Sequence, residues 1–276
     1  MRILLTNDDG ISSPGILMLA AGLREAGHRV FVVAPASNQS GVSHSISFIN
    51  GPCKLTEIDR DTWICQGTPV DCIVTGLLGG IPELSILPAV QMENGAGSPP
   101  DAVISGINRG ANLGTDIVYS GTAAAARQGA LCGIPSLALS LTESAEWNWE
   151  MAVVFVVEQL TEMMACWKPD SFVNVNIPNR RELPDSLVHG FPSLRYYNDH
   201  MERYHAADGS VYCFSRPGDI SPSLENGAVP GSQSVRVDAR PERGSDWDAV
   251  ENNNASISEI FVHPVLLESV RGKGEA

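Results

Sequence analysis

The chain has 276 residues and a formal net charge of −14 at pH 7, and 43% of its residues are apolar. So acidic a net charge argues against an extended nucleic-acid interface, which needs a basic face. The apolar fraction is enough for a sizeable core, but no apolar run is long enough for a transmembrane helix, and the N-terminus lacks a signal-peptide pattern. The six cysteines show no Cys-x-x-Cys spacing. We therefore expect a reduced, cytoplasmic protein without a membrane partner.

The first ten residues predict a buried strand, a tight turn and the start of a helix. The apolar run Ile3–Leu5 ends at the polar cluster Asn7–Gly10, and a helical pattern follows over residues 14–26. Four more buried strands are expected over residues 30–34, 102–105, 136–140 and 172–178. Helices are expected to start near Pro69, Ser120 and residue 148. This alternation predicts an α/β fold with a doubly wound, mostly parallel, Rossmann-like sheet.

The pattern changes after about residue 180. Short β-like stretches follow over residues 210–214, 234–237 and 257–262, separated by polar loops. We assign residues 1–185 to the Rossmann-like catalytic domain, 186–270 to a C-terminal β-rich extension for packing and oligomerisation, and 271–276 to a flexible tail. Residues 83–100 lack periodicity and are interpreted as a surface insertion.

Polar side chains follow three of the predicted strands. Asp8 and Asp9 follow the first strand, Ser40 follows the second and Asn108 follows the third. Because ligands of open α/β sheets bind outside the carboxyl ends of the strands, we expect these side chains to lie together. Their oxygens suit a hard divalent cation such as magnesium or manganese. For the adjacent carboxylates taken alone, capping of a helix N-terminus is an equally good explanation.

The segment Ser120–Thr122 opens a predicted helix and is a candidate anion-binding turn. Gly121 allows close approach of the backbone, and the hydroxyls of Ser120 and Thr122 add donors. An ordinary helix cap is the alternative, but a metal loop nearby favours phosphate. Asn112 is grouped with Asp8 and Asp9 as catalytic, in the wall between metal and phosphate. His44 is a candidate substrate-binding proton donor or a structural residue.

Several polar motifs occur in this order along the chain. They are Thr6-Asn7-Asp8-Asp9-Gly10-Ile11, Ser40-Gly41-Val42-Ser43-His44-Ser45, Gly67-Thr68-Pro69-Val70-Asp71-Cys72, Ser105-Gly106-Ile107-Asn108-Arg109-Gly110 and Asp116-Ile117-Val118-Tyr119-Ser120-Gly121-Thr122. In these motifs, and in their order and spacing over about residues 1–180, the chain resembles the SurE family, the survival-protein-E nucleotidases.

The resemblance implies a metal-dependent phosphatase that acts on nucleoside 5′- and 3′-monophosphates. It implies Asp8, Asp9, Ser40 and Asn108 as metal ligands, with one Mg²⁺ or Mn²⁺ expected in each subunit. It also implies a homodimer or homotetramer formed partly by exchange of C-terminal segments. Three alternatives stay open: a phosphatase acting through an aspartyl-phosphate on Asp8, a nucleotide-binding module without turnover, and an interaction protein on an α/β scaffold.

Overall fold

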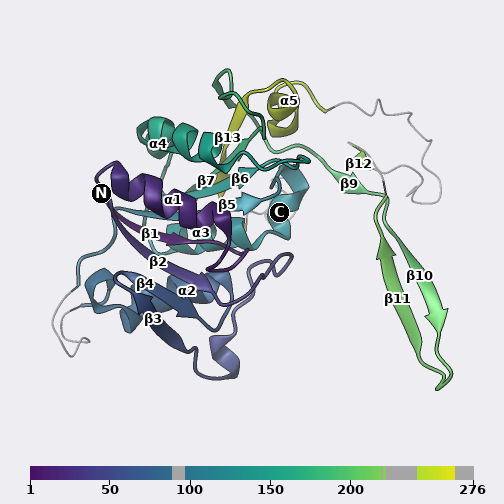
Figure 1. Cartoon of the computed structure of the whole chain (residues 1–276), viewed down its shortest axis with the longest axis horizontal. Coiled ribbons are helices and arrows are strands. Elements are labelled where there is room, and N and C mark those ends of the chain that lie inside the picture. The colour runs from purple at the N-terminus through teal and green to yellow at the C-terminus, as the bar shows by residue number, and fades with distance from the viewer. Residues whose placement is uncertain (89–96, 219, 222–240, 265–276) are drawn as a thin grey trace, which may run out of the picture.

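The computed structural model describes residues 1–88, 97–218, 220–221 and 241–264, with a nine-stranded sheet at its centre (Figure 1). From one edge to the other its strands are β3 (Leu55–Asp59), β4 (Thr62–Cys65), β2 (Arg29–Pro35), β1 (Arg2–Thr6), β5 (Ala102–Arg109), β6 (Ser136–Leu141), β7 (Ser171–Ile177), β13 (Ala255–Phe261) and β8 (Leu187–His189). The six strands from β4 to β7 run parallel, whereas β3 and β13 are antiparallel to β4 and β7. The predicted α/β fold is confirmed.

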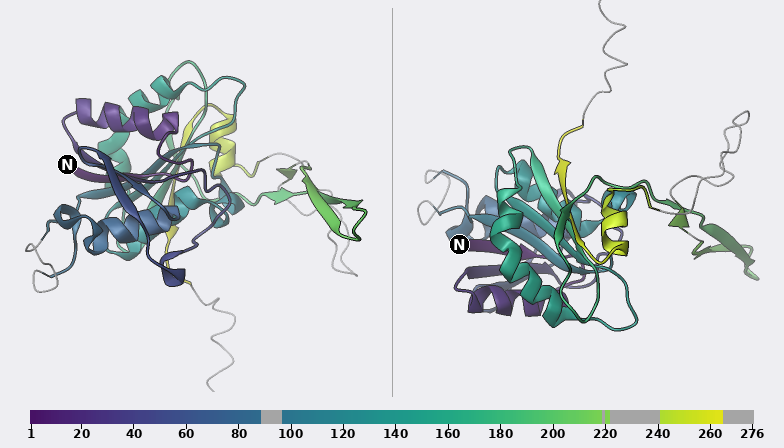
Figure 2. Two further views of the ribbon diagram at one scale, coloured as in Figure 1. Left: turned by 60° about the horizontal axis from the view of Figure 1, so that its bottom comes forward. Right: turned by 90° about the horizontal axis from the view of Figure 1, so that it is seen from above.

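Helices cover both faces of this sheet. Their bounds are α1 (Pro14–Glu25), α2 (Pro69–Thr75), α3 (Gly121–Leu131) and α4 (Trp149–Ala165). Helices α1 and α4 pack on one face, while α2 and α3 pack on the other (Figures 1 and 2). The alternation of side chains in β1 explains this double cover, because Ile3 and Leu5 face the α1–α4 core and Leu4 faces the α2 core. All three side chains are fully buried.

Local sequence signals set the helix starts as expected. Thr68 caps α2, since its hydroxyl accepts from the backbone N–H of Asp71 at 3.2 Å and the Asp71 carboxylate accepts from the N–H of Thr68 at 2.8 Å. Pro69 follows at the first helical position, where its missing N–H costs nothing. Among the residues that the structure describes, no helix has both the length and the apolar character needed to cross a membrane.

Two predicted elements differ from the structure. Strand β5 does not stop at residue 105 but continues to Arg109, with a register shift against β6 between Ser105 and Asn108. The stretch at residues 257–262 was expected in the C-terminal extension, but its residues belong largely to β13, an inner strand of the main sheet. That expectation is wrong because Ala255 and Ile257 fit the core beside β7.

The rest of the C-terminal region is irregular. It contains β9 (Tyr196–Tyr197), β10 (His200–His205), β11 (Val211–Arg216), β12 (Ile220–Ser221) and α5 (Asp246–Glu251). Strands β10 and β11 form an antiparallel hairpin that projects away from the sheet (Figures 1 and 2). The division into domains at residue 185 stays a prediction, and both the stretch at 234–237 and the tail at 271–276 lie outside the described residues.

Short helical turns complete the fold. They are η1 (Phe48–Asn50), η2 (Gly76–Gly80), η3 (Pro82–Leu84) and η5 (Gly114–Val118). The predicted surface insertion at residues 83–100 begins inside the protein, because Leu84 is fully buried in the core with Ile73 and Leu77. Residues 89–96 of that insertion lie outside the described ranges.

Candidate active site

A cavity of about 480 Å³ opens at the carboxyl edge of the parallel strands. Its lining includes five of the residues selected from the sequence, namely Asp8, Ser40, Asn108, Asn112 and Ser120. They come from the ends of β1 and β5, from the loop after β2 and from the start of α3. The expected convergence of strand ends is therefore present.

The turn after β1 is closed by its own side chains. The amide of Asn7 donates to the carbonyl of Gly10 at 2.9 Å and accepts from the N–H of Gly10 at 3.2 Å. Gly10 has a φ of 97°, which favours glycine. This turn fixes the backbone on which Asp8 and Asp9 stand.

Asp8 is almost fully buried and is held by the start of α3. Its Oδ1 accepts a hydrogen bond from the hydroxyl of Thr122 at 2.5 Å. Burial raises the pKa of Asp8, the bond from Thr122 opposes that shift, and the charge of Asp9 adds to it. Gly121 permits the close packing, because a Cβ at this position would lie 2.8 Å from the Cβ of Asp8. Burial thus disfavours the charged form of Asp8, and a cation beside it would offset that cost.

Asp9 points toward the end of β5. Its Oδ2 accepts from the backbone N–H of Arg109 at 2.9 Å. Burial raises the pKa of Asp9, while this hydrogen bond and the charge of Arg109 oppose the rise. Asp9 is not among the residues that line the cavity, but it sits beside Asp8 and Arg109, which are.

Ser40 is exposed and is carried by a loop that is tied at two points. The N–H of Gln39 donates to the carbonyl of Asp8 at 2.7 Å, and the hydroxyl of Ser43 donates to the carbonyl of Val118 at 2.7 Å. These bonds join the loop after β2 to the turn after β1 and to the end of η5. Ser40 is thereby brought to the rim of the cavity.

Asn108 and Asn112 are buried and oriented by hydrogen bonds. The Nδ2 of Asn108 donates to the carbonyl of Gly110 at 2.9 Å, which leaves its Oδ1 available as a ligand. The Nδ2 of Asn112 donates to the hydroxyl of Ser140 at 2.8 Å, and its N–H donates to Oδ1 of Asn176 at 2.7 Å. Asn112 is a rigid part of the cavity wall.

The two hydroxyls of the predicted phosphate turn differ, since Ser120 only accepts a hydrogen bond and keeps its proton to donate, whereas Thr122 donates to Asp8. The hydroxyl of Ser120 accepts from the N–H of Ala123 at 3.0 Å, the ordinary cap that the sequence left as an alternative. The hydroxyl of Thr122 donates its proton to the carboxylate of Asp8. An anion at this turn would therefore draw on the positive end of α3, its N–H groups and the hydroxyl of Ser120, but not on that of Thr122.

His44 lies apart from the lining of the cavity. Its Nε2 is 3.1 Å from Oε1 of Gln128 on α3. Burial lowers the pKa of His44, and the charge of Arg127 lowers it further against the bond to Gln128. The geometry is that of a half-buried structural histidine.

The sequence did not single out the outer wall of the cavity. Asp116, Tyr197 and Asp199 line it, the last two from the C-terminal region. The carboxylate of Asp116 forms a largely buried ion pair with Arg195 and accepts from the hydroxyl of Tyr197 at 2.5 Å. Burial raises the pKa of Asp116, and the charge of Arg195 opposes that rise. Asp116 lies in one of the quoted motifs, but no pattern connected it to a partner 79 residues away.

Comparisons with known proteins identify the family of the chain. The family model described as "Survival protein SurE" matches residues 3–202. The chain belongs to the SurE family. A protein of Stenotrophomonas maltophilia named 5′-nucleotidase SurE is 41% identical over 95% of this chain and 90% of its own length. One of the same name from Xanthomonas axonopodis pv. citri is 35% identical over the same shares of the two chains.

A solved SurE structure shares the architecture. The crystal structure of the SurE protein from Aquifex aeolicus matches with a TM-score of 0.77 and 31% identity, covering 99% of this chain and 98% of that one. The match thus includes the described part of the C-terminal region as well as the sheet. The resemblance drawn from the motifs of residues 1–180 is confirmed.

The donor atoms of this SurE chain fit a hard divalent cation. The described residues contain no group of three or more His, Cys, Asp or Glu side chains arranged to hold a metal ion. A cation here would need the two carboxylates together with the Asn108 amide oxygen, the Ser40 hydroxyl and water. The neighbouring carboxylates of Asp8 and Asp9, both with raised pKa, provide the unbalanced charge that such an ion would neutralise.

Proposed function

We propose that the protein is a metal-dependent phosphomonoesterase that hydrolyses nucleoside 5′- and 3′-monophosphates to nucleoside and phosphate. The convergence of Asp8, Asn108 and Ser120 on one cavity at the carboxyl edge of the sheet carries this proposal. The name 5′-nucleotidase SurE of the relatives supports the same reaction class. Phosphoryl transfer requires positioning and charge neutralisation more than covalent chemistry by side chains, and a cation held by these residues would supply the neutralisation.

Asp8, Asp9, Asn108 and Ser40 would hold one Mg²⁺ or Mn²⁺ in each subunit. When bound, such an ion neutralises the phosphoryl charge and lowers the pKa of a coordinated water. Thr122 orients Asp8 through its hydroxyl, and the turn after β1 presents both carboxylates in a fixed direction. These contacts hold the ligands in place before the substrate arrives.

The start of α3 would bind the phosphate beside the cation. Ser120 lines the cavity as the cap of this helix, and Gly121 leaves space for the carboxylate of Asp8. Asn112 would form the wall between the two groups, since Ser140 and Asn176 hold it in one orientation. His44 would have a structural role, through its contact with Gln128, and would not touch the reacting groups.

Assembly into a homodimer or homotetramer remains part of the proposal. The β10–β11 hairpin exposes Met201, Tyr204, Tyr212 and Phe214, an apolar set that a second copy of the chain would cover. Cytoplasmic location and the absence of an extended nucleic-acid partner likewise stay predictions from the sequence.

A panel of phosphate esters assayed with different divalent ions tests the function. We expect phosphate release from AMP and from 3′-AMP in Mn²⁺ or Mg²⁺, loss of that release in excess chelator, and recovery when the ion is returned. Full activity in chelator would exclude the metal-dependent reaction. Binding of AMP without phosphate release would favour the nucleotide-binding module instead, and a trapped phosphoenzyme would favour the aspartyl-phosphate route.

A further inference from the structure

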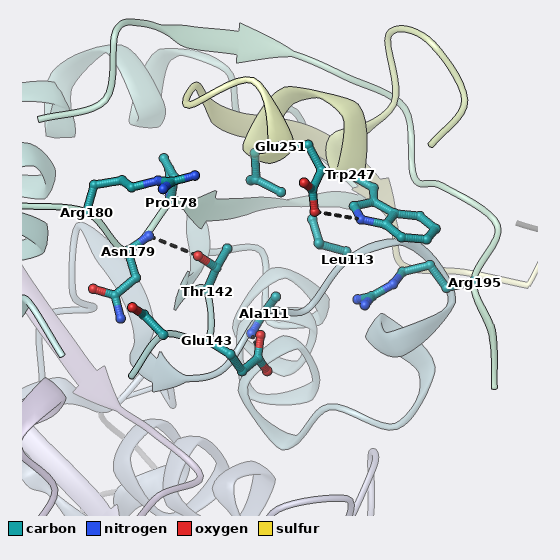
Figure 3. Close-up of a pocket in the computed structure, with 12 residues that line it drawn as sticks. Ala111, Leu113, Thr142, Glu143, Pro178, Asn179, Arg180, Arg195, Trp247 and Glu251 are labelled. Atoms are coloured by element: carbon teal, nitrogen blue, oxygen red, sulfur yellow. Dashed lines mark hydrogen bonds between the residues drawn. The ribbon is translucent and has the colours of Figure 1, made fainter. Parts of the chain in front are cut away.

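The described residues line further cavities outside the one at the candidate active site. The cavity drawn in Figure 3 shares Ala111 and Glu143 with the first cavity and is an extension of the same site. Another cavity, of about 250 Å³, lies beside the end of β4, and its lining includes Ser37, Cys65 and Gln66. None of the described residues lines both this cavity and the first one. Its cysteine therefore needs a separate explanation.

Two free cysteines, 12 positions apart in the sequence, meet beside this cavity. The Sγ atoms of Cys53 and Cys65 are 3.1 Å apart. The β3–β4 hairpin brings them together, because Leu55 pairs with Cys65. Next to this pair, the N–H of Gln66 donates to the carbonyl of Lys54 at 2.9 Å. A disulfide bond is about 2.05 Å long, so the two sulfurs need to approach by only about 1 Å to form one.

The two thiols have different access to small molecules. Cys53 is partly exposed to solvent, whereas Cys65 is fully buried and borders only the small cavity. Gly67 leaves the space that the sulfur of Cys53 occupies, because a Cβ at position 67 would lie 2.9 Å from that atom. Hydrogen peroxide is scarcely larger than water and fits such a cavity, while a larger thiol reagent reaches the pair from the side of Cys53.

A third thiol, that of Cys72 on α2, supports the buried member of the pair. Hydrogen bonds from Cys72 and from Cys53 lower the pKa of Cys65, and burial opposes that shift. Burial, followed by the bond to Cys65, raises the pKa of Cys53 and of Cys72. The negative charge therefore settles on Cys65, the form that reacts with oxidants. A soft-metal site is not indicated, because the described residues contain no group of three such side chains arranged to hold an ion.

We propose that Cys53 and Cys65 are a redox modification site, at which a hydroperoxide forms a reversible disulfide. The thiolate of Cys65 attacks one oxygen of hydrogen peroxide and the O–O bond breaks. The leaving hydroxide takes up the proton that Cys65 released and becomes water, and Cys65 becomes a sulfenic acid. The sulfur of Cys53 then attacks the sulfur of Cys65, and the hydroxyl leaves as water with the proton of Cys53. Two thiols are oxidised, and one peroxide is reduced to two waters.

The same geometry makes the bond reversible. An external thiolate reaches the partly exposed sulfur of Cys53, and Cys65 leaves as a thiolate. A second external thiol then releases Cys53 and completes the reduction. In a reducing compartment a disulfide of this kind is transient. This inference goes beyond the proposed phosphatase reaction and does not depend on it.

Oxidation of the whole folded protein, followed by peptide mapping, tests the pair. The reduced protein is treated with hydrogen peroxide, its remaining thiols are blocked with iodoacetamide, and the chain is cleaved after Lys and Arg and then before Asp. Cleavage before Asp71 separates Cys65 from Cys72, so the two candidate partners of Cys53 lie on different peptides. We expect the peptide that links Cys53 to Cys65 to be about tenfold more abundant than any other linked pair, and to disappear after treatment with dithiothreitol.

Two variants and an unfolded sample serve as comparisons. Cys53→Ser should abolish the linked peptide and leave Cys65 as a sulfenic acid that dimedone traps. Cys213→Ser removes an exposed thiol outside the pair and should leave the linked peptide unchanged. The wild-type chain oxidised in concentrated urea should give a mixture of pairs, because the hairpin no longer holds the two sulfurs together.

The mapping of the wild-type protein decides the proposal whether or not the variants fold. Absence of a bond between Cys53 and Cys65 at an excess of peroxide would overturn it. A bond from Cys53 to Cys72 in its place, or the same mixture of pairs in the folded and the unfolded protein, would overturn it as well.

Discussion

The two walls of the first cavity are built differently. The inner wall consists of Asp8, Asn108 and Ser120, which stand at the ends of buried strands and at the start of α3. The outer wall includes Tyr197 and Asp199 from the C-terminal region, where the surrounding strands are short and exposed. The inner wall is fixed by the core itself, whereas the outer wall is attached to it through Asp116 and Arg195.

We expect this difference between the walls to separate residues that act in the reaction from residues that bind the substrate. The proposed cation ligands Asp8 and Asp9 stand directly after a buried strand, and such rigid elements can hold ligands within fractions of an ångström. The outer wall lines the same cavity but carries none of the proposed cation ligands. Changes to the inner wall should therefore abolish turnover, and changes to the outer wall should act through stability and substrate affinity.

The largest effect is expected from the paired carboxylates. Asp8→Asn and Asp9→Asn should each lower kcat for AMP by about a hundredfold to a thousandfold, because the charge that balances the cation is lost. Thermal unfolding should change little, since burial already disfavours the charged form of Asp8. Steady-state kinetics and circular dichroism check both points, with the exposed Asp59→Asn as control. Wild-type turnover in either variant would contradict the assignment.

The next effect concerns the attachment of the outer wall. Arg195→Met should lower the free energy of unfolding by about 3–5 kcal/mol, because it leaves the carboxylate of Asp116 buried without its cation. Denaturant unfolding measures this change. The double variant Arg195→Met with Asp116→Asn should recover much of the loss. A double variant as unstable as the single one would show that the ion pair is not what attaches this wall.

A smaller effect is expected at Thr122, which contacts the proposed ligand Asp8 but is not itself a proposed ligand. Thr122→Val keeps the shape of the side chain but removes the hydrogen bond to Asp8. Loss of such supporting contacts usually weakens metal binding about 10–100-fold. Titration of activity with Mn²⁺ measures the change, and Thr122→Ser should restore wild-type behaviour. Equal Mn²⁺ dependence in the valine and wild-type proteins would remove Thr122 from the site.

The smallest effect is a pH dependence at His44. Burial lowers its pKa from the usual 6.5, so the unfolded chain takes up a proton at a higher pH than the folded one. The stability contributed by neutral His44 is complete above 6.5 and decreases as the pH falls below that value toward the folded pKa. Comparison of His44→Asn with the wild type by thermal unfolding between pH 7 and pH 5 measures the pH-dependent stability that His44 contributes. Parallel curves would contradict it.

The sequence predicted the inner wall and missed the outer one for a physical reason. Asp8 and Asn108 follow apolar strands of regular spacing, and parallel strands bring their carboxyl ends to one edge. Arg195 reaches Asp116 through a contact between distant segments, and no local periodicity encodes such a pairing. For the same reason β13 was placed in the extension, since a strand pattern does not specify which neighbour it pairs with.

Thr122 shows what a motif alone does not specify. Its hydroxyl was assigned to a phosphate, but the structure turns it onto Asp8. The residue type identified a donor near the site, while only the packing of α3 against the turn after β1 determined the acceptor.

Metal binding at the inner wall is tested most directly by a crystal structure of the protein soaked in Mn²⁺, with anomalous diffraction recorded near the manganese edge. We expect one strong anomalous peak in each chain, in contact with oxygens of Asp8, Asp9 and Asn108 and close to Ser40. A peak elsewhere, or none at this position at saturating Mn²⁺, would contradict it.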